Sequence, residues 1–93
     1  MKFAAIIEYS TDTAKITEHR PTHRAYLTQL LNEGKLAASG PFMDDWGALI
    51  VYEAPTKEAA EAIMQNDPFY KLGVFVKWDL RPWNAVFVNK ELF

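Results

Sequence analysis

The sequence contains no cysteine, which excludes disulfide bonds, thiolate zinc sites and cysteine-dependent catalysis. It has only two histidines, so histidines alone cannot supply a metal shell either. The four glycines, at positions 34, 40, 47 and 73, are isolated from one another and form no glycine-rich phosphate loop. We therefore predict that the protein requires no metal, haem or nucleotide cofactor.

Long apolar runs and basic runs are also missing. No apolar stretch approaches the roughly 20 residues needed to cross a bilayer, and Glu8 interrupts the N-terminal apolar stretch before it reaches signal-peptide length. The ten Lys and Arg residues are scattered among twelve Asp and Glu residues, so no footprint for nucleic acid or an anionic membrane appears. These absences predict a cytoplasmic protein without nucleic-acid or membrane partners.

What the chain does contain is a globular composition with many aromatic rings. It is 49% hydrophobic and 24% charged, and its 93 residues have room for one domain, which we expect to span residues 1–93. A domain of this size buries only about 60–65% of the surface of its unfolded chain. Because six Phe, four Tyr and three Trp are a heavy load for it, some rings are expected to pack against a partner or line a pocket.

The first third of the chain predicts a strand followed by a helix. Residues 2–9 fit a strand buried on both faces, and the polar residues 10–17 favour a turn. A helix is expected from about Pro21, where the missing N–H of a first-turn proline costs nothing, to the Asn32-Glu33-Gly34 end. Its apolar stripe consists of His23, Leu27, Leu30 and Leu31.

The middle of the chain predicts two strands joined by a hairpin. The strand from Leu36 to Met43 is weakened by Gly40-Pro41, so it should be bulged or lie at a sheet edge. Residues 44–47 form the hairpin connection, and residues 47–54 form the most regular strand of the chain.

The last third predicts a helix and a strand. Thr56 can cap a helix over residues 57–65, and Asp67-Pro68-Phe69 breaks that pattern. In the final strand, Val74, Val76, Trp78 and Leu80 share one face, and Pro82 ends it. The order is therefore β-α-β-β-α-β. We predict an α+β, ferredoxin-like fold, in which a four-stranded antiparallel sheet carries both helices on one face.

Such a sheet leaves its second face without a helix to cover it. Apolar side chains on that face need a partner, so we predict a homodimer that packs two sheets face to face. The tail from Trp83 to Phe93 is expected to wrap onto the same body or the partner subunit.

The two histidines are four residues apart, a spacing that zinc sites use on helices. Metalloprotease motifs also need Glu directly after the first histidine, whereas Arg20 follows His19 here. With Pro21 next in the chain, His19 should lie at or before the start of the helix, which breaks the geometry. We predict no metal ligands.

His23 shares a helix face with leucines and should therefore point inward or toward a cleft. It is either a core-edge histidine bonded to backbone or a general acid/base, since imidazole titrates near neutrality. Asp67 is the candidate carboxylate partner, although Asp-Pro-Phe is also what an ordinary capped turn looks like. If His23 is an acid/base group and Asp67 is its partner, we predict that the two form a hydrogen-bonded pair that lines the main pocket.

Other polar and aromatic residues offer a binding role. Arg20 and Arg24 could hold an anionic ligand or form a solvated face, and Asp44 and Asp45 are expected to be solvated turn residues. Candidate walls of the site are Trp46, Phe69, Tyr70 and Trp83.

Several segments together resemble the YCII-related (YciI-like) family over nearly the whole chain. Each is short, but their order and spacing are specific. They are the segment His19 to Leu27, Gly34-Lys35-Leu36, Ser39-Gly40-Pro41, Gly47, Asp67-Pro68-Phe69, Gly73 and Arg81-Pro82-Trp83.

The resemblance implies a ferredoxin-like fold of the dimeric α/β-barrel group, with dimers formed through the sheet faces. A His/Asp-centred active site has been proposed for the family, and its histidine falls on His23 and its aspartate on Asp67. Some relatives act on chlorinated or hydroxylated aromatic-ring products, and the wider group includes muconolactone isomerases and cofactor-free oxygenases.

Two functions remain open from the sequence. The first is a small enzyme that needs no cofactor, in which His23 transfers a proton, Asp67 orients it, and Arg20, Trp46 and Phe69 bind a small oxygenated ring-like substrate for elimination, isomerisation or hydrolysis. The second is a non-catalytic small-molecule-binding or sensor module with the same fold. An imidazole and a carboxylate within hydrogen-bond reach beside a cleft would favour the first.

Overall fold

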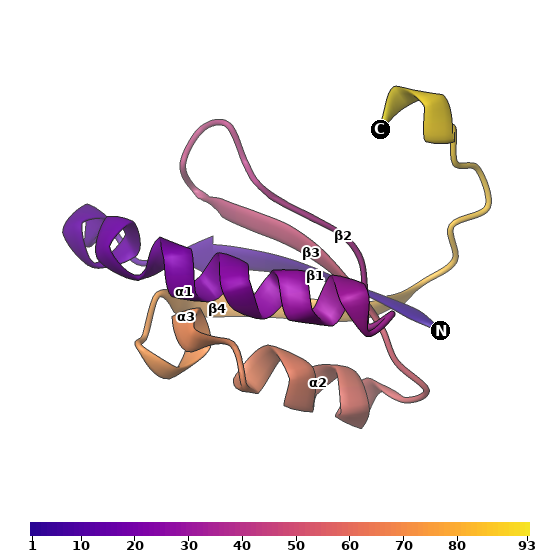
Figure 1. Cartoon of the computed structure of the whole chain (residues 1–93), viewed down its shortest axis with the longest axis horizontal. Coiled ribbons are helices and arrows are strands. Elements are labelled where there is room, and N and C mark those ends of the chain that lie inside the picture. Colours follow the sequence, from indigo (N-terminus) through magenta and orange to yellow (C-terminus); the bar gives the residue numbers. More distant parts are fainter.

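In the computed structural model, which describes residues 1–93, helices lie on one face of a four-stranded antiparallel sheet (Figure 1). The predicted order of strands and helices is confirmed, with one additional short helix before the last strand. The elements are β1 (Lys2–Tyr9), α1 (Thr13–Asn32), β2 (Leu36–Pro41), β3 (Gly47–Glu53), α2 (Lys57–Gln65), α3 (Pro68–Lys71), β4 (Phe75–Trp83) and a terminal 3₁₀ turn, η1 (Lys90–Leu92).

The sheet order β2-β3-β1-β4 places β1 and β3 at the centre and makes β2 and β4 the edges. Ala5 of β1 pairs with Ile50 of β3 on one side and with Leu80 of β4 on the other, and all three are buried beneath the helices. The prediction that β1 is buried on both faces is wrong, because Ile6 on the opposite face is exposed. Helices cover only one face, so the strand alternates instead.

The first helix starts two turns earlier than the sequence predicted. Asp12 accepts a hydrogen bond from the Lys15 N–H at 3.1 Å and caps the helix, so the polar segment after it is helical and not a turn. Ile16 anchors this part in the core. Pro21 therefore lies inside α1, where it has no N–H to donate to the Thr17 carbonyl.

The two edge strands end at other residues than predicted. β2 lies at a sheet edge and is bulged between Leu36 and Ala38, which confirms the prediction, but it ends at Pro41 instead of Met43. β4 continues through Pro82 to Trp83, and the prediction that Pro82 ends it is wrong. A proline is tolerated there because an edge strand leaves alternate N–H groups without a partner in the sheet.

A bulge opposite Glu8 and Tyr9 also changes the face on which the first residues of β4 lie. Phe75 pairs with Tyr9 and is buried, whereas Val76, which the sequence pattern placed on the inner face, is 46% exposed. An inserted residue shifts the period-2 alternation by one position, and a pattern of apolar residues alone does not reveal it.

The uncovered face of the sheet is apolar along the middle of its two central strands and mixed on β4, where Trp83 lies on the same face as two charged residues. Ala4 pairs with Val51 and Ile6 with Leu49, but the β4 residues beside them are Arg81 and Asp79. The structure contains no helix that is long and apolar enough to span a membrane.

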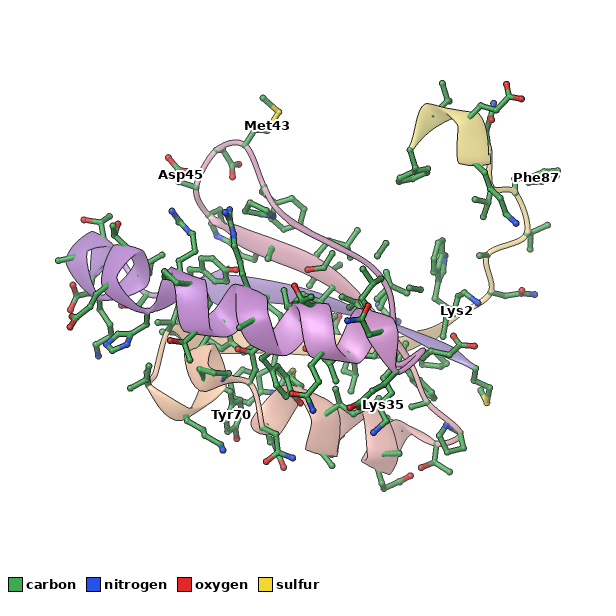
Figure 2. The ribbon with its side chains drawn as sticks, viewed as in Figure 1. Lys2, Lys35, Met43, Asp45, Tyr70 and Phe87 are labelled. Carbon is green, nitrogen blue, oxygen red and sulfur yellow. The ribbon has the colours of Figure 1, made fainter.

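The C-terminal tail, drawn in yellow, leaves the sheet after β4 (Figure 1). Phe87 is 94% exposed and points away from the other elements (Figure 2). Phe93 at the end of the tail borders a pocket with Pro41 and Leu49 but is itself 95% exposed, so the tail lies near its own body without packing tightly on it.

Candidate functional site

His23 lies on the buried stripe of α1. Ile16, His23 and Leu30 are its three buried residues and recur every seven positions, which corresponds to two helical turns. Only 6% of His23 is exposed. The apolar residues before and after it on the same stripe therefore hold the imidazole against the core.

Asp67 lies at the junction of α2 and α3. It is the N-cap of α3, with its Oδ1 accepting a hydrogen bond from the Phe69 N–H at 2.9 Å. The same Oδ1 is 2.7 Å from Nδ1 of His23, across 44 residues of sequence. The carboxylate is thus both a helix cap and the partner of the imidazole, so the two interpretations of Asp67 are compatible.

This contact defines the tautomer of the ring. An ionised carboxylate only accepts hydrogen bonds, so Nδ1 of His23 carries the proton and donates it to Asp67. Nε2 forms no hydrogen bond within the chain. The ring also stacks on Phe69, with centroids 4.0 Å apart and planes 3° from parallel. Phe69 and Asp67 therefore fix the imidazole from two sides and leave Nε2 free to exchange a proton.

A pocket of about 440 Å³ lies between α1 and the edge strand β2. Arg20, His23 and Phe69, three of the residues predicted to form the site, line it. Asp67 does not, because it is completely buried behind the imidazole. The expectation that the pair lines the pocket therefore holds for His23 only.

The other predicted wall residues lie elsewhere. Trp46 borders a second pocket of about 420 Å³ at the end of β1, and Arg20 lines both pockets. Tyr70 packs against Trp78, with ring centroids 5.1 Å apart, and Trp83 lines a cavity beside the N-terminus.

Two tyrosines near Asp67 were missed by sequence reasoning. Burial, together with the negative charge of Asp67, raises the pKa of Tyr9 to about 12, while the guanidinium groups of Arg20 and Arg24 act in the opposite direction. Burial and Asp67 also raise the pKa of Tyr52. Both residues lie on the helix-facing side of their strands. The alternation of β1 could have placed Tyr9 there, but its proximity to Asp67 depends on the packing of α3.

Two buried oxygen atoms at and near the Asp67 carboxylate lack hydrogen-bond partners within the chain. Asp67 Oδ2 and the hydroxyl of Tyr52 are both buried without a hydrogen-bond partner in the chain. Oδ1 thus carries both the cap and the imidazole contact, while Oδ2 is buried without a partner from the chain.

No group of three or more potential metal-ligating side chains occurs in the structure. His19 lies within α1, not before its start as predicted, and its Nε2 is 3.7 Å from the Glu18 carboxylate. The two histidines thus share a helix, but His23 has its own carboxylate partner in Asp67.

Comparison with known proteins places the chain in a family. Residues 1–84 match the YCII-related domain. The chain is 32% identical to Protein YciI of Escherichia coli O6:H1 (strain CFT073) and to Protein YciI of Shigella flexneri, and each alignment covers 85% of this chain and 95% of the relative.

Among solved structures, the fold is similar to that of 5-chloro-2-hydroxyhydroquinone dehydrochlorinase from Burkholderia phenoliruptrix AC1100, determined in complex with 2,5-dihydroxybenzoquinone. The superposition has a TM-score of 0.78 and 24% sequence identity, and it covers 90% of this chain and 94% of the other. The likeness shows a shared fold. From the match over residues 1–84 and the identity with YciI, the chain belongs to the YCII-related domain family.

Proposed function

We propose that the protein is a small enzyme that carries out acid/base chemistry without a cofactor on an oxygenated ring-like metabolite. The observation that supports this most directly is the 2.7 Å contact between His23 Nδ1 and Asp67 Oδ1 behind the wall of the pocket between α1 and β2. A buried carboxylate that orients an imidazole is a recurrent arrangement for proton transfer.

In this proposal, Nε2 of His23 accepts a proton from a hydroxyl group of the substrate. Asp67 keeps Nδ1 protonated and balances the positive charge that the ring gains. The electron pair released on the substrate oxygen moves into the ring, and a ring carbon takes up a proton, which completes an isomerisation. In an elimination, the protonated carbon is the one that bears the leaving group, and loss of a second hydroxyl proton then expels that group with its bonding pair. The step is redox-neutral for the protein and needs proton transfer only.

The ring-like substrate class is supported by the structural neighbour. That protein is named as a dehydrochlorinase of a hydroxylated ring and was solved with a dihydroxyquinone. In this chain, Phe69 offers an apolar surface and Arg20 a positive charge in the same pocket. We propose both as substrate-binding residues, with Trp46 contributing from the adjoining pocket that shares Arg20.

We also propose that two copies associate through their uncovered sheet faces. Ile6 and Leu49 pair at the centre of this face and remain 44% and 39% exposed in one chain, and association would remove them from water. The charged residues of β4 would then lie toward the edge of the interface, where ion pairs between copies remain partly hydrated.

A non-catalytic ligand-binding module is the alternative, and one observation favours it. Asp67 caps α3 through the Phe69 N–H, so the carboxylate has a structural role that does not require catalysis. In that case His23 would serve as a polar wall of the pocket, and ligands would bind without being converted.

The test uses 5-chloro-2-hydroxyhydroquinone, kept free of oxygen, with chloride release as the readout. We expect turnover by the wild type and a loss of about 10²–10⁴-fold in His23→Gln, the range that general acid/base groups contribute. The matched control is His19→Gln, which changes the half-buried histidine one turn earlier on α1 and should leave the rate unchanged. Saturable binding of 2,5-dihydroxybenzoquinone with no turnover of the chlorinated compound would favour the binding module instead.

A further inference from the structure

The pocket beside α1 has a charged end and an apolar end. The helix contributes residues 20, 23, 24, 27, 28 and 31 to its wall, a single stripe of about three turns. Arg20 and Arg24 occupy the N-terminal part of this stripe, whereas Leu27 and Leu31 occupy the C-terminal part, next to Leu36 of β2. A ligand that fills the pocket therefore meets cations at one end and hydrocarbon at the other.

The two arginines of the charged end have no partner within the protein. The chain has a third arginine, Arg81, which forms an ion pair with Asp79 at 3.7 Å. Neither Arg20 nor Arg24 makes an ion pair or a side-chain hydrogen bond, although the chain as a whole carries a net charge of −2. Being one turn apart on α1, the two guanidinium groups can approach the same small group from adjacent positions.

The wall of this pocket places no carboxylate beside the two arginines, although Arg20 also lines the adjoining pocket with Glu8 and Asp45. No Asp or Glu lines the pocket. The nearest buried acid, Asp67, is engaged by His23 and is shielded from the pocket by the imidazole. Both arginines also act on the phenol of Tyr9, another wall residue, against the larger effect of its burial. Their positive charges are therefore directed toward the same space.

We propose that the pocket selects ligands with one planar oxyanion, such as a carboxylate or an ionised ring hydroxyl, on an apolar body. The oxyanion lies between Arg20 and Arg24, and the body rests on Leu27, Leu31 and Leu36. Guanidinium groups suit this role because they remain charged and donate paired hydrogen bonds to planar oxyanions. His23, one position before Arg24, then faces the atoms next to the anion.

This inference rests on the proposed function only in naming the ligand class of the same pocket. The test is therefore a binding measurement that requires no turnover. Three probes are titrated into the full chain and followed by amide NMR shifts: benzoate, the uncharged isostere benzamide, and acetate, which keeps the charge and lacks the body. We expect benzoate to bind with shifts along α1 and β2, and both other probes to bind at least tenfold more weakly.

The variants separate the two ends of the pocket. Arg20→Gln combined with Arg24→Gln should weaken benzoate binding at least tenfold and leave benzamide binding unchanged. Arg81→Gln is the matched control, because it removes a surface arginine on the opposite face of the sheet and should leave benzoate binding unchanged. A chemical-shift map of each free variant verifies that it folds as the wild type does.

Equal binding of benzoate and benzamide overturns the proposal, as does unchanged benzoate binding in the double arginine variant or the absence of saturable shifts at the pocket. The His23→Gln variant distinguishes failure of the proposed anion selectivity from failure of the proposed catalysis. That variant should retain benzoate binding even though it loses proton transfer. An anion-selective pocket on a chain without turnover would therefore support the inference and contradict only the catalysis.

Discussion

Two turns of this protein share one local sequence pattern but differ in burial and in the elements that pack against them. Each has an aspartate followed two residues later by an aromatic ring, in Asp44-Asp45-Trp46 and in Asp67-Pro68-Phe69. In both, the aspartate side chain accepts a hydrogen bond from the backbone N–H of the aromatic residue, at 3.0 Å and 2.9 Å respectively. The backbone chemistry of the two turns is thus nearly the same.

Their surroundings are opposite. The first turn is the tip of the β2–β3 hairpin, where Asp45 and its neighbour Met43 lie at the outer end of the loop (Figure 2), and Trp46 is 47% exposed. The second turn lies beneath α1, where Phe69 is 1% exposed and stacks on His23. The comparison teaches that the Asp-x-aromatic pattern only builds a turn, and that the helix packed over the turn makes the second one a candidate site.

The largest contrast should come from the two aromatic rings. Phe69→Ala removes a fully buried ring and should lower the free energy of unfolding by about 3–5 kcal/mol, because the core and the imidazole above it lose their packing. Trp46→Ala should cost within about 1 kcal/mol, since half of that ring is already in water. Urea denaturation of both variants measures the difference. Similar losses would mean that the hairpin tip is as tightly packed as the turn beneath α1.

A smaller contrast is expected between the two aspartates. Asp67→Asn retains an oxygen that can cap α3 but removes the charge that faces His23, and it should cost about 1–3 kcal/mol. Asp44→Asn should stay within about 0.5 kcal/mol, because its side chain is solvated. Urea denaturation gives the stabilities, and ¹⁵N NMR of the imidazoles shows the tautomers. Retention of the wild-type Nδ1–H tautomer of His23 in Asp67→Asn, with full stability, would contradict a specific role for the carboxylate.

The smallest contrast is in the response to alkali. The pKa of Tyr9 is raised to about 12, chiefly by burial and further by Asp67. In the unfolded chain this phenol ionises near its ordinary value of 10.0, so between these two pH values the unfolded state binds fewer protons than the folded state. Stability should therefore fall as the pH rises from 10 to 12.

Tyr9→Phe should flatten this decline, and urea denaturation across that range measures it. Tyr52, whose pKa is also raised by burial, contributes in the same direction, so Tyr52→Phe should flatten it further. An alkaline slope that is identical in the wild type and both variants would show that neither phenol is shielded by the fold. The hairpin tip contains no tyrosine and takes no part in this effect.

The sequence was informative wherever a residue's position followed from periodicity. The helix stripe placed His23 inward, and the strand order predicted an antiparallel sheet with helices on one side. It was least informative where a single residue changes the phase or the boundary of an element. The bulge beside Phe75 and the Asp12 cap both belong to this class, because each depends on one local hydrogen-bond arrangement.

The site itself could be predicted only in part for a related reason. The residues of the pair could be named, since the resemblance pointed to His23 and Asp67. That Asp67 would be hidden behind the imidazole, and that Arg24, Leu27 and β2 would form the pocket, depends on how α1 and α3 pack. Packing of this kind joins residues far apart in sequence, and no short pattern records it.

The proline inside α1 has a consequence for how the pocket opens. Because Pro21 cannot donate to the Thr17 carbonyl, the helix lacks one backbone hydrogen bond between its first two turns and the turns that carry His23. The segment from Thr13 to Arg20 has a single buried residue, Ile16, whereas the rest of α1 has two, His23 and Leu30. It can therefore fray as a unit at lower free energy than the rest of the helix. Such an opening would carry Arg20 away from the pocket while Leu30 and the Asp67 contact hold His23 in place, so one wall of the pocket can move without disturbing the imidazole.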